Sequence, residues 1–200
     1  MARTASKTRP AELLDGIVSY LVRHGVAELS LRPLAKAVKS SPRVLLYYFG
    51  SKERLIVKAL TRVREHQRGT FSAMRQAKHD RPSDACRAIW KQMSAPQSEP
   101  VFRFFFETYA IALRHPKNYA DFLSNAVGDW LEFVAAPLVS KGHSLEDARA
   151  FATIVIAGFR GFMLDYCATH DRERTDRAVD LWLNSLDTIR PDLQEAPHVR

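Results

Sequence analysis

The close spacing of helix ends before residue 52 restricts the fold more than any other feature of this sequence. A first stretch with apolar residues at helical spacing, about 10–24, stops at Gly25, since glycine adopts the left-handed conformation of a helix C-terminus. Ser30 is a favourable N-cap for a second helix, which ends near Val38. The sequence therefore predicts two short helices in quick succession.

A third short helix follows after only a few residues. Ser41 can cap it, and Pro42 takes the first helical position, where a missing N–H costs least. Gly50 ends this helix, and Ser51 caps a much longer fourth one. Three short helices with a tight turn between the second and third predict a helix-turn-helix unit, whose second element enters the major groove of DNA.

The stretch ELSLRPLAKAVKSSPRVLLYYFGSKERL (28–55) resembles the DNA-binding domain of TetR-family transcriptional regulators, most specifically in FGSKERL. The segment DYCATHDRERTDRAVDLWL also resembles a frequent C-terminal pattern of the family. The chain departs from the family at Lys39, where a turn glycine is common, at Arg43, where a small residue is common, and at Leu46, usually tyrosine. The resemblance implies an all-α protein with two domains. Residues 1–66 would form the helix-turn-helix domain with a basic N-terminal tail, and residues 67–200 a helical ligand-binding and dimerisation domain.

The distribution of charge agrees with a nucleic-acid partner. Residues 1–68 hold 14 Lys and Arg against 5 Asp and Glu, whereas residues 69–200 hold 16 against 17. The first third therefore carries a net charge of +9 and the remainder −1. A basic part of this kind faces nucleic acid, faces an acidic membrane surface, or is simply a solvated face.

The recognition helix supplies the candidate DNA contacts. Arg43, at its start, can pair with guanine, while Lys52 lies at a helix N-terminus that favours phosphate. The tyrosines can contact phosphates or pack in the core, either arginine can contact phosphate alone, and Phe49 is interpreted as a core anchor. The predicted DNA-binding residues are Arg32, Ser41, Pro42, Arg43, Val44, Tyr47, Tyr48 and Lys52.

The rest of the chain predicts only helices, over about 51–77, 82–94, 99–114, 117–140, 144–169 and 172–189. Ser144 and Asp147 form a capping box. The helices carry more aromatic rings than a small domain needs, which favours a pocket for an apolar or aromatic effector, although such stripes are often plain core. The candidate ligand-binding residues are Trp90, Met93, Phe102, Phe105, Phe106, Tyr109, Trp130, Phe133, Phe159, Met163 and Tyr166.

Arg160 interrupts an apolar run and has two interpretations. It can orient a ligand together with Glu107, Asp129 and Asp165, or it can pair with one of these carboxylates. Pairing is favoured, because an unpaired buried charge is costly.

The last two helices provide the candidate dimer interface, as the family resemblance implies. Two glycines inside one helix suggest a close approach by another backbone, either a partner subunit or a neighbouring helix. The last helix carries an apolar stripe. The candidate interface residues are Gly158, Gly161, Ala178, Leu181, Trp182, Ser185 and Ile189.

Other classes of function are less well supported. The seven histidines include no pair at metal-ligand spacing on a helix, and no serine or cysteine lies in a nucleophile elbow. The family resemblance implies a cytoplasmic homodimeric repressor that binds double-stranded operator DNA and a small effector, and we expect no metal, cofactor or membrane partner. The longest apolar run, at 151–159, is too short to span a bilayer. The alternatives are an enzyme or a non-specific binder of nucleic acid or membrane surfaces.

Overall fold

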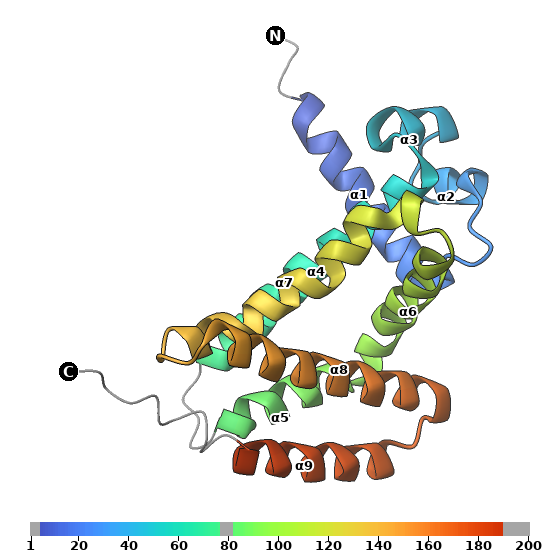
Figure 1. Cartoon of the computed structure of the whole chain (residues 1–200). Helices are drawn as coiled ribbons and strands as arrows, with labels where there is room; N and C mark the ends of the chain where they lie inside the picture. The colour runs from blue at the N-terminus through green and yellow to red at the C-terminus, as the bar shows by residue number, and fades with distance from the viewer. Residues whose placement is uncertain (1–4, 77–81, 190–200) are drawn as a thin grey trace. The chain divides into compact units, whose positions relative to one another are not determined.

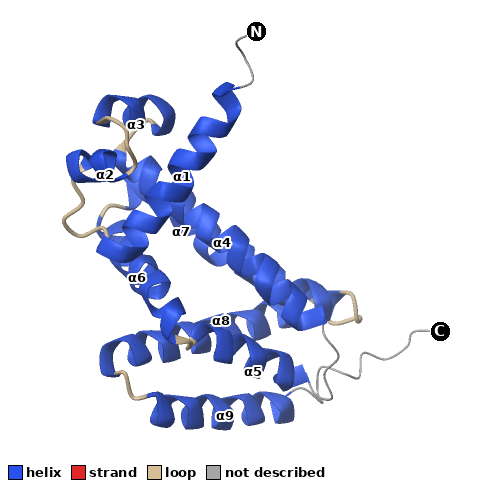
Figure 2. Cartoon of the chain, turned by 180° about the vertical axis from the view of Figure 1, so that it is seen from behind, coloured by secondary structure: helices blue, strands red, loops and turns tan. Residues whose placement is uncertain are grey.

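The computed structural model describes residues 5–76 and 82–189, with side chains over 9–76 and 83–186. Every regular element in these ranges is a helix, as Figure 2 shows. The chain divides into two compact units. Unit 1 comprises 1–70 and 100–123, and unit 2 comprises 71–99 and 124–200. The all-α class predicted from the sequence is confirmed.

Unit 1 contains the predicted helix-turn-helix (Figure 1). The N-terminal helices of this unit are α1 (Ala5–His24), α2 (Leu31–Ala37), α3 (Pro42–Phe49) and most of α4 (Lys52–Gln76). α1 begins earlier than predicted and contains Pro10 instead of starting there. One turn of helix precedes the proline, so its missing N–H removes only a bond near the helix end.

Local capping bonds fix the ends of α3 and α4 as the sequence predicts. The Ser41 hydroxyl accepts a hydrogen bond from the backbone N–H of Val44 at 3.3 Å, and the Ser51 hydroxyl accepts one from Arg54 at 3.2 Å. Ser30 is also an N-cap, but its side chain forms no capping bond. Helix α3 is therefore bounded on both sides by its own sequence.

The turn between α2 and α3 contains a strained residue. Lys39 has a φ of 50°, in the left-handed region that glycine occupies at lower cost. The next residue closes the turn through a 2.8 Å bond from the Ser40 N–H to the carbonyl of Ala35. Lysine at this position thus retains a positive charge where the backbone favours glycine.

Helix α6 (Glu99–Arg114) lies mainly in unit 1, although it follows the four N-terminal helices in sequence by a long interval. A Glu107 carboxylate oxygen accepts a 2.8 Å bond from the backbone N–H of Val26, in the corner between α1 and α2. Gly25, at φ 71°, leaves room for this carboxylate, because a Cβ there would collide with it. α6 thus groups with the N-terminal helices. The domain boundary predicted between residues 66 and 67 remains a prediction.

Unit 2 contains α5 (Pro82–Met93), most of α7 (Ala120–Val139), α8 (Leu145–Thr169) and α9 (Arg172–Ile189). α8 and α9 run side by side in both ribbon views (Figures 1 and 2). The predicted cap of α8 is present, because the Ser144 hydroxyl accepts a 3.0 Å bond from the Asp147 N–H. The Trp90 indole N–H of α5 donates to Asp176 of α9 at 2.6 Å.

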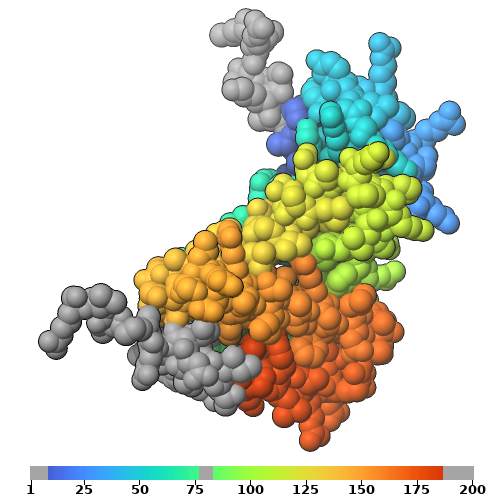
Figure 3. Space-filling view, in the orientation of Figure 1, coloured from blue at the N-terminus to red at the C-terminus, as the bar shows by residue number. Residues whose placement is uncertain are grey.

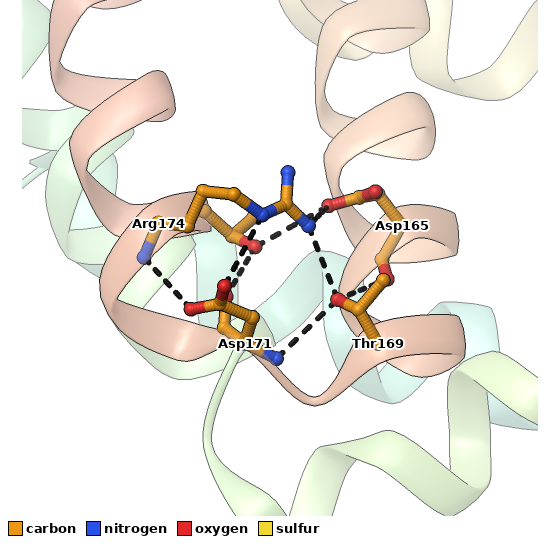
Figure 4. A network of polar contacts seen from close by, with 5 residues as sticks. Asp165, Thr169, Asp171 and Arg174 are labelled. Carbon is orange, nitrogen blue, oxygen red and sulfur yellow. Dashed lines mark hydrogen bonds and ion pairs between the residues drawn. The ribbon is translucent and has the colours of Figure 1, made fainter.

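A polar network secures the turn between α8 and α9 (Figure 4). The guanidinium of Arg174 donates to Asp165 at 2.6 Å and to Thr169 at 3.2 Å, and it also pairs with Asp171. The hydrogen bond to Asp165 raises the pKa of Arg174 above its ordinary value. His170, with φ 55°, provides the left-handed residue that ends α8.

Gly158 lies beneath the Trp182 indole. A Cβ on Gly158 would collide with Cζ2 of that ring. The Trp182 ring also contacts Phe159 and Phe162, each with centroids 5.3 Å apart. The glycine thus makes room for a side chain of the same chain, rather than for the backbone of a partner.

This packing predicts opposite effects of alanine at two mid-helix glycines. Gly158→Ala should lower the free energy of unfolding by about 1–3 kcal/mol, because the new methyl group overpacks the indole. Gly128→Ala in α7 is the control, since nothing lies within 4 Å of its Cβ position. The free energy of unfolding of that variant should rise by up to about 1 kcal/mol, because alanine has a higher helix propensity than glycine. Urea unfolding measures both, and equal effects would contradict the assigned packing.

Candidate nucleic-acid interface

The recognition helix presents one face outward. Leu45 and Phe49 are buried in unit 1, as predicted for Phe49, while Arg43, Leu46 and Tyr47 are exposed. These three lie at spacings of three and four residues, which place them on one side of the helix. Tyr47 is 81% exposed, so its ring does not pack in the core.

The other candidates on α3 lie closer to the protein. Pro42, Val44 and Tyr48 are partly buried, and the Ser41 hydroxyl serves as the helix cap. The Tyr47 and Tyr48 rings meet edge to face, with centroids 5.1 Å apart. Tyr48 thus supports Tyr47 while keeping part of its own surface open.

Lys52 does not extend freely from the start of α4. Its ammonium donates a 3.3 Å bond to the Leu29 carbonyl, and the side chain is partly buried. An ammonium has three N–H donors, so a phosphate contact remains compatible with this bond. The pKa of Glu53, the residue after Lys52, is lowered from its ordinary value. A hydrogen bond from a backbone N–H and then one from the Ser51 hydroxyl lower this pKa by more than partial burial raises it.

Two further cations were missed from the sequence. Lys36 and Lys39 are exposed on and after α2, at spacings of four and seven residues from the predicted contact Arg32, which is also exposed. Figure 3 shows long side chains from the α2–α3 segment, in blue to cyan, extending from the surface. Lys36 lies four residues after Arg32 on the same helix, a signal that could have identified it, whereas Lys39 lies beyond the helix end. The four exposed cations Arg32, Lys36, Lys39 and Arg43 are named the basic rim.

The candidate ligand-binding residues fall into separate groups of rings. In unit 1, Phe105 contacts Phe106, Tyr109 and Phe122, at centroid distances of 5.3, 5.6 and 6.3 Å. In unit 2, Trp90 stacks on Phe159, while Trp130 contacts Phe71 and Phe133. Several candidates are core residues by burial, and Phe102 is partly buried. The buried candidates are Trp90, Met93, Phe159, Met163 and Tyr166.

The carboxylates proposed as partners of Arg160 have other roles. Glu107 bonds to Val26 in unit 1, and Asp165 pairs with Arg174. Arg160 donates to the carbonyl of Ala126, next to the first turn of α7. The predicted pairing of Arg160 with a carboxylate stays a prediction.

The dimer candidates divide by their exposure. The Trp182 ring packs against Gly158 of the same chain, and Ala178 is partly buried. Leu181 is 65% exposed, and Gly161 and Ser185 are also exposed. The Ile189 side chain lies outside the described residues.

An exposed stripe on α8 was missed from the sequence, apart from its member Gly161. Its members follow one another at alternating spacings of four and three residues, which is the pattern of a helix seam. All are small or apolar, and all are exposed in the chain. This α8 stripe consists of Ala150, Ile154, Ala157, Gly161, Leu164 and Ala168.

Comparison with known proteins identifies the N-terminal segment. The family model of bacterial regulatory proteins of the tetR family matches residues 13–59. This range contains α2, α3 and the start of α4, with the exposed face described above. No curated protein is significantly similar in sequence to the chain.

Solved structures share the fold over nearly the whole chain. A transcriptional regulator from Rhodococcus is 18% identical, with a TM-score of 0.73, covering 94% of this chain and 99% of its own. A TetR-family regulator from Mesorhizobium loti is 14% identical, with a TM-score of 0.69 and coverages of 94% and 98%. GusR from Salmonella enterica is 18% identical, with a TM-score of 0.70 and coverages of 92% and 98%.

The residues that match the family model include the exposed helix α3. In the described residues, no group of three or more His, Cys, Asp or Glu could hold a metal ion. The matched family and the structural neighbours are regulators, not enzymes. Residues 13–59 thus match the tetR family of bacterial regulatory proteins, and nearly the whole chain shares the fold of solved transcriptional regulators.

Proposed function

We propose that this protein is a cytoplasmic repressor that binds a palindromic operator as a homodimer and leaves it when a small apolar or aromatic effector binds. The observation that carries the proposal is the exposed face of α3, with its basic rim. The two-domain division at residues 66 and 67 belongs to the same proposal. DNA recognition, dimer assembly and effector response are supported by different residues.

The support for operator binding comes from shape and charge together. An α-helix with its side chains is about 10–12 Å across, close to the width of the major groove, and α3 is such a helix of eight residues. Arg43 lies at its N-terminal end, where base contacts concentrate, and Arg32, Lys36 and Lys39 flank it with exposed charges. Arg43 reads a base edge in this proposal, whereas the α2 cations hold phosphates.

The support for the dimer comes from α8. Among the described helices, α8 is the one whose length and composition would suffice to cross a membrane, which differs from the expectation drawn from the run at 151–159. One side of α8 packs in unit 2, and the α8 stripe on the other side is open. A helix that is apolar on both sides needs cover on both sides. A second copy provides that cover by a twofold interface, with Leu181 of α9 extending it.

The support for an effector response comes from α6. This helix carries Phe105, Phe106 and Tyr109, and on the same helix Glu107 holds the corner between α1 and α2 through the Val26 N–H. An effector that displaces the α6 rings would therefore disturb the hydrogen bond that orders this corner. Release from DNA follows if the effector prefers the displaced form.

Substitutions on α3 and α2 should separate base reading from phosphate binding. Arg43→Ala should weaken the free energy of binding to a site selected from random DNA by about 1–3 kcal/mol and relax the base preference at one position of that site. Lys36→Ala should weaken selected and scrambled DNA alike and reduce the salt slope by about 1 for each phosphate that is no longer neutralised. Fluorescence anisotropy at several salt concentrations measures both. Equal losses on both DNAs for Arg43→Ala would assign it to phosphate.

A charge in the α8 stripe should dissociate the dimer. Leu164 is 54% exposed in the chain, so Leu164→Asp should leave the fold intact but give monomers that bind operator poorly. Leu113→Asp on α6, at a leucine that is 61% exposed, is the matched control. If light scattering showed dimers for both variants, the α8 stripe would not be the dimer interface. Trp182→Asp is unsuitable, because it also breaks the ring cluster within the chain.

Effector binding and operator binding should oppose each other by the same factor. A compound that lowers operator affinity tenfold supplies about 1.4 kcal/mol of coupling, and operator DNA must weaken the compound equally. A panel of small aromatic and aliphatic compounds would be screened by thermal shift, and a hit titrated with and without DNA. Phe106→Ala and Trp130→Ala should reduce the response while preserving compound-free operator binding. Unchanged compound affinity in the presence of operator would refute release by an effector.

A further inference from the structure

We propose that Leu46 is a specificity-determining residue whose side chain contacts the C5 methyl group of a thymine in the operator. The inference rests on the proposed docking of α3 in the major groove. Leu46 is 39% exposed, although α3 has two buried apolar anchors of its own in Leu45 and Phe49. Its exposed part lies on the face that would meet the bases.

The position of Leu46 on α3 supports this role. Arg43 and Tyr47 are exposed three residues before it and one residue after it, and all three share one side of the helix. Because the diameter of a helix matches the width of the major groove, the side of α3 that faces the groove floor lies within reach of base edges. Leu46 therefore lies about one turn after Arg43 and next to Tyr47 in sequence, on the outward side of α3.

The chemistry of the side chain selects its partner. Leucine has no hydrogen-bonding group, and the apolar group that base pairs present in the major groove is the thymine methyl. Placing leucine against a phosphate or a carbonyl oxygen instead would desolvate that polar group without a bond. A thymine at this position is therefore the base that fits best.

The surroundings of Leu46 indicate DNA as the occupant of this face. A single exposed leucine is ordinary on a protein surface, so exposure alone has no weight. Here the leucine belongs to the same helix-turn-helix as the basic rim, formed by the exposed cations Arg32, Lys36, Lys39 and Arg43. This charge complements a polyanion and would oppose an apolar protein partner.

The test removes the methyl group from the DNA as well as the side chain from the protein. Each thymine of the selected operator is replaced in turn by deoxyuridine, which lacks only the C5 methyl group. Anisotropy at constant salt then compares wild type, Leu46→Ala and the control Leu113→Ala. At one position in each half-site, deoxyuridine should lower wild-type affinity about three- to fivefold. The loss should disappear in Leu46→Ala and persist in Leu113→Ala.

Further variants make the outcome decisive. Leu46→Met, which stays apolar, should retain the deoxyuridine effect, and Leu46→Gln, similar in length but polar, should lose it. Leu46→Gln replaces Leu46→Ala if circular dichroism shows the latter unfolded. The inference is overturned if Leu46→Ala keeps the wild-type deoxyuridine profile, or if the selected half-site contains no thymine. Failure to select any sequence would instead overturn the proposed operator binding itself.

Discussion

The burial of Leu45 and Phe49 is the interaction on which the DNA-binding surface depends. An isolated helix of eight residues is not stable in water, because its few hydrogen bonds do not offset the cost of nucleation. The Ser41 cap helps to start α3, but packing of these two side chains in unit 1 keeps it helical. The outward face of α3 can then carry residues chosen for a ligand and not for stability.

The same unit contains a link to distant sequence. Glu107 reaches the Val26 N–H across 81 positions of the chain, and Gly25 leaves the space it needs. A hydrogen bond to a charged acceptor is stronger than one between neutral groups, and a partly buried N–H without a partner would be costly. The corner between α1 and α2 therefore depends on α6 for its order, which gives α6 a physical connection to the helix-turn-helix.

Local features of this fold were predictable, and features that depend on packing were not. Ser41 and Ser144 mark helix starts correctly because a cap bond involves residues three positions apart. By contrast, the approach of the Trp182 ring to Gly158 of the same chain was not predicted, and a dimer role for Trp182 stays a prediction. Periodicity shows that a face is apolar, but not what covers it.

The missed α8 stripe has a related cause. Its alanines and glycine give little contrast with the apolar residues on the buried side, so α8 has no clearly polar face in sequence. The role of Lys52 was also predicted from local position, and its bond to the Leu29 carbonyl depends on a contact from 23 residues away. Such non-local bonds carry no signature in a single sequence.

The distribution of indole rings has a practical consequence. All three tryptophans of the chain, at positions 90, 130 and 182, belong to unit 2, whereas unit 1 contains tyrosines but no tryptophan. Fluorescence excited at wavelengths longer than those that tyrosine absorbs therefore comes from the tryptophans of unit 2 alone. Tryptophan fluorescence of the unlabelled protein thus reports on unit 2, and a label on the DNA reports DNA binding separately.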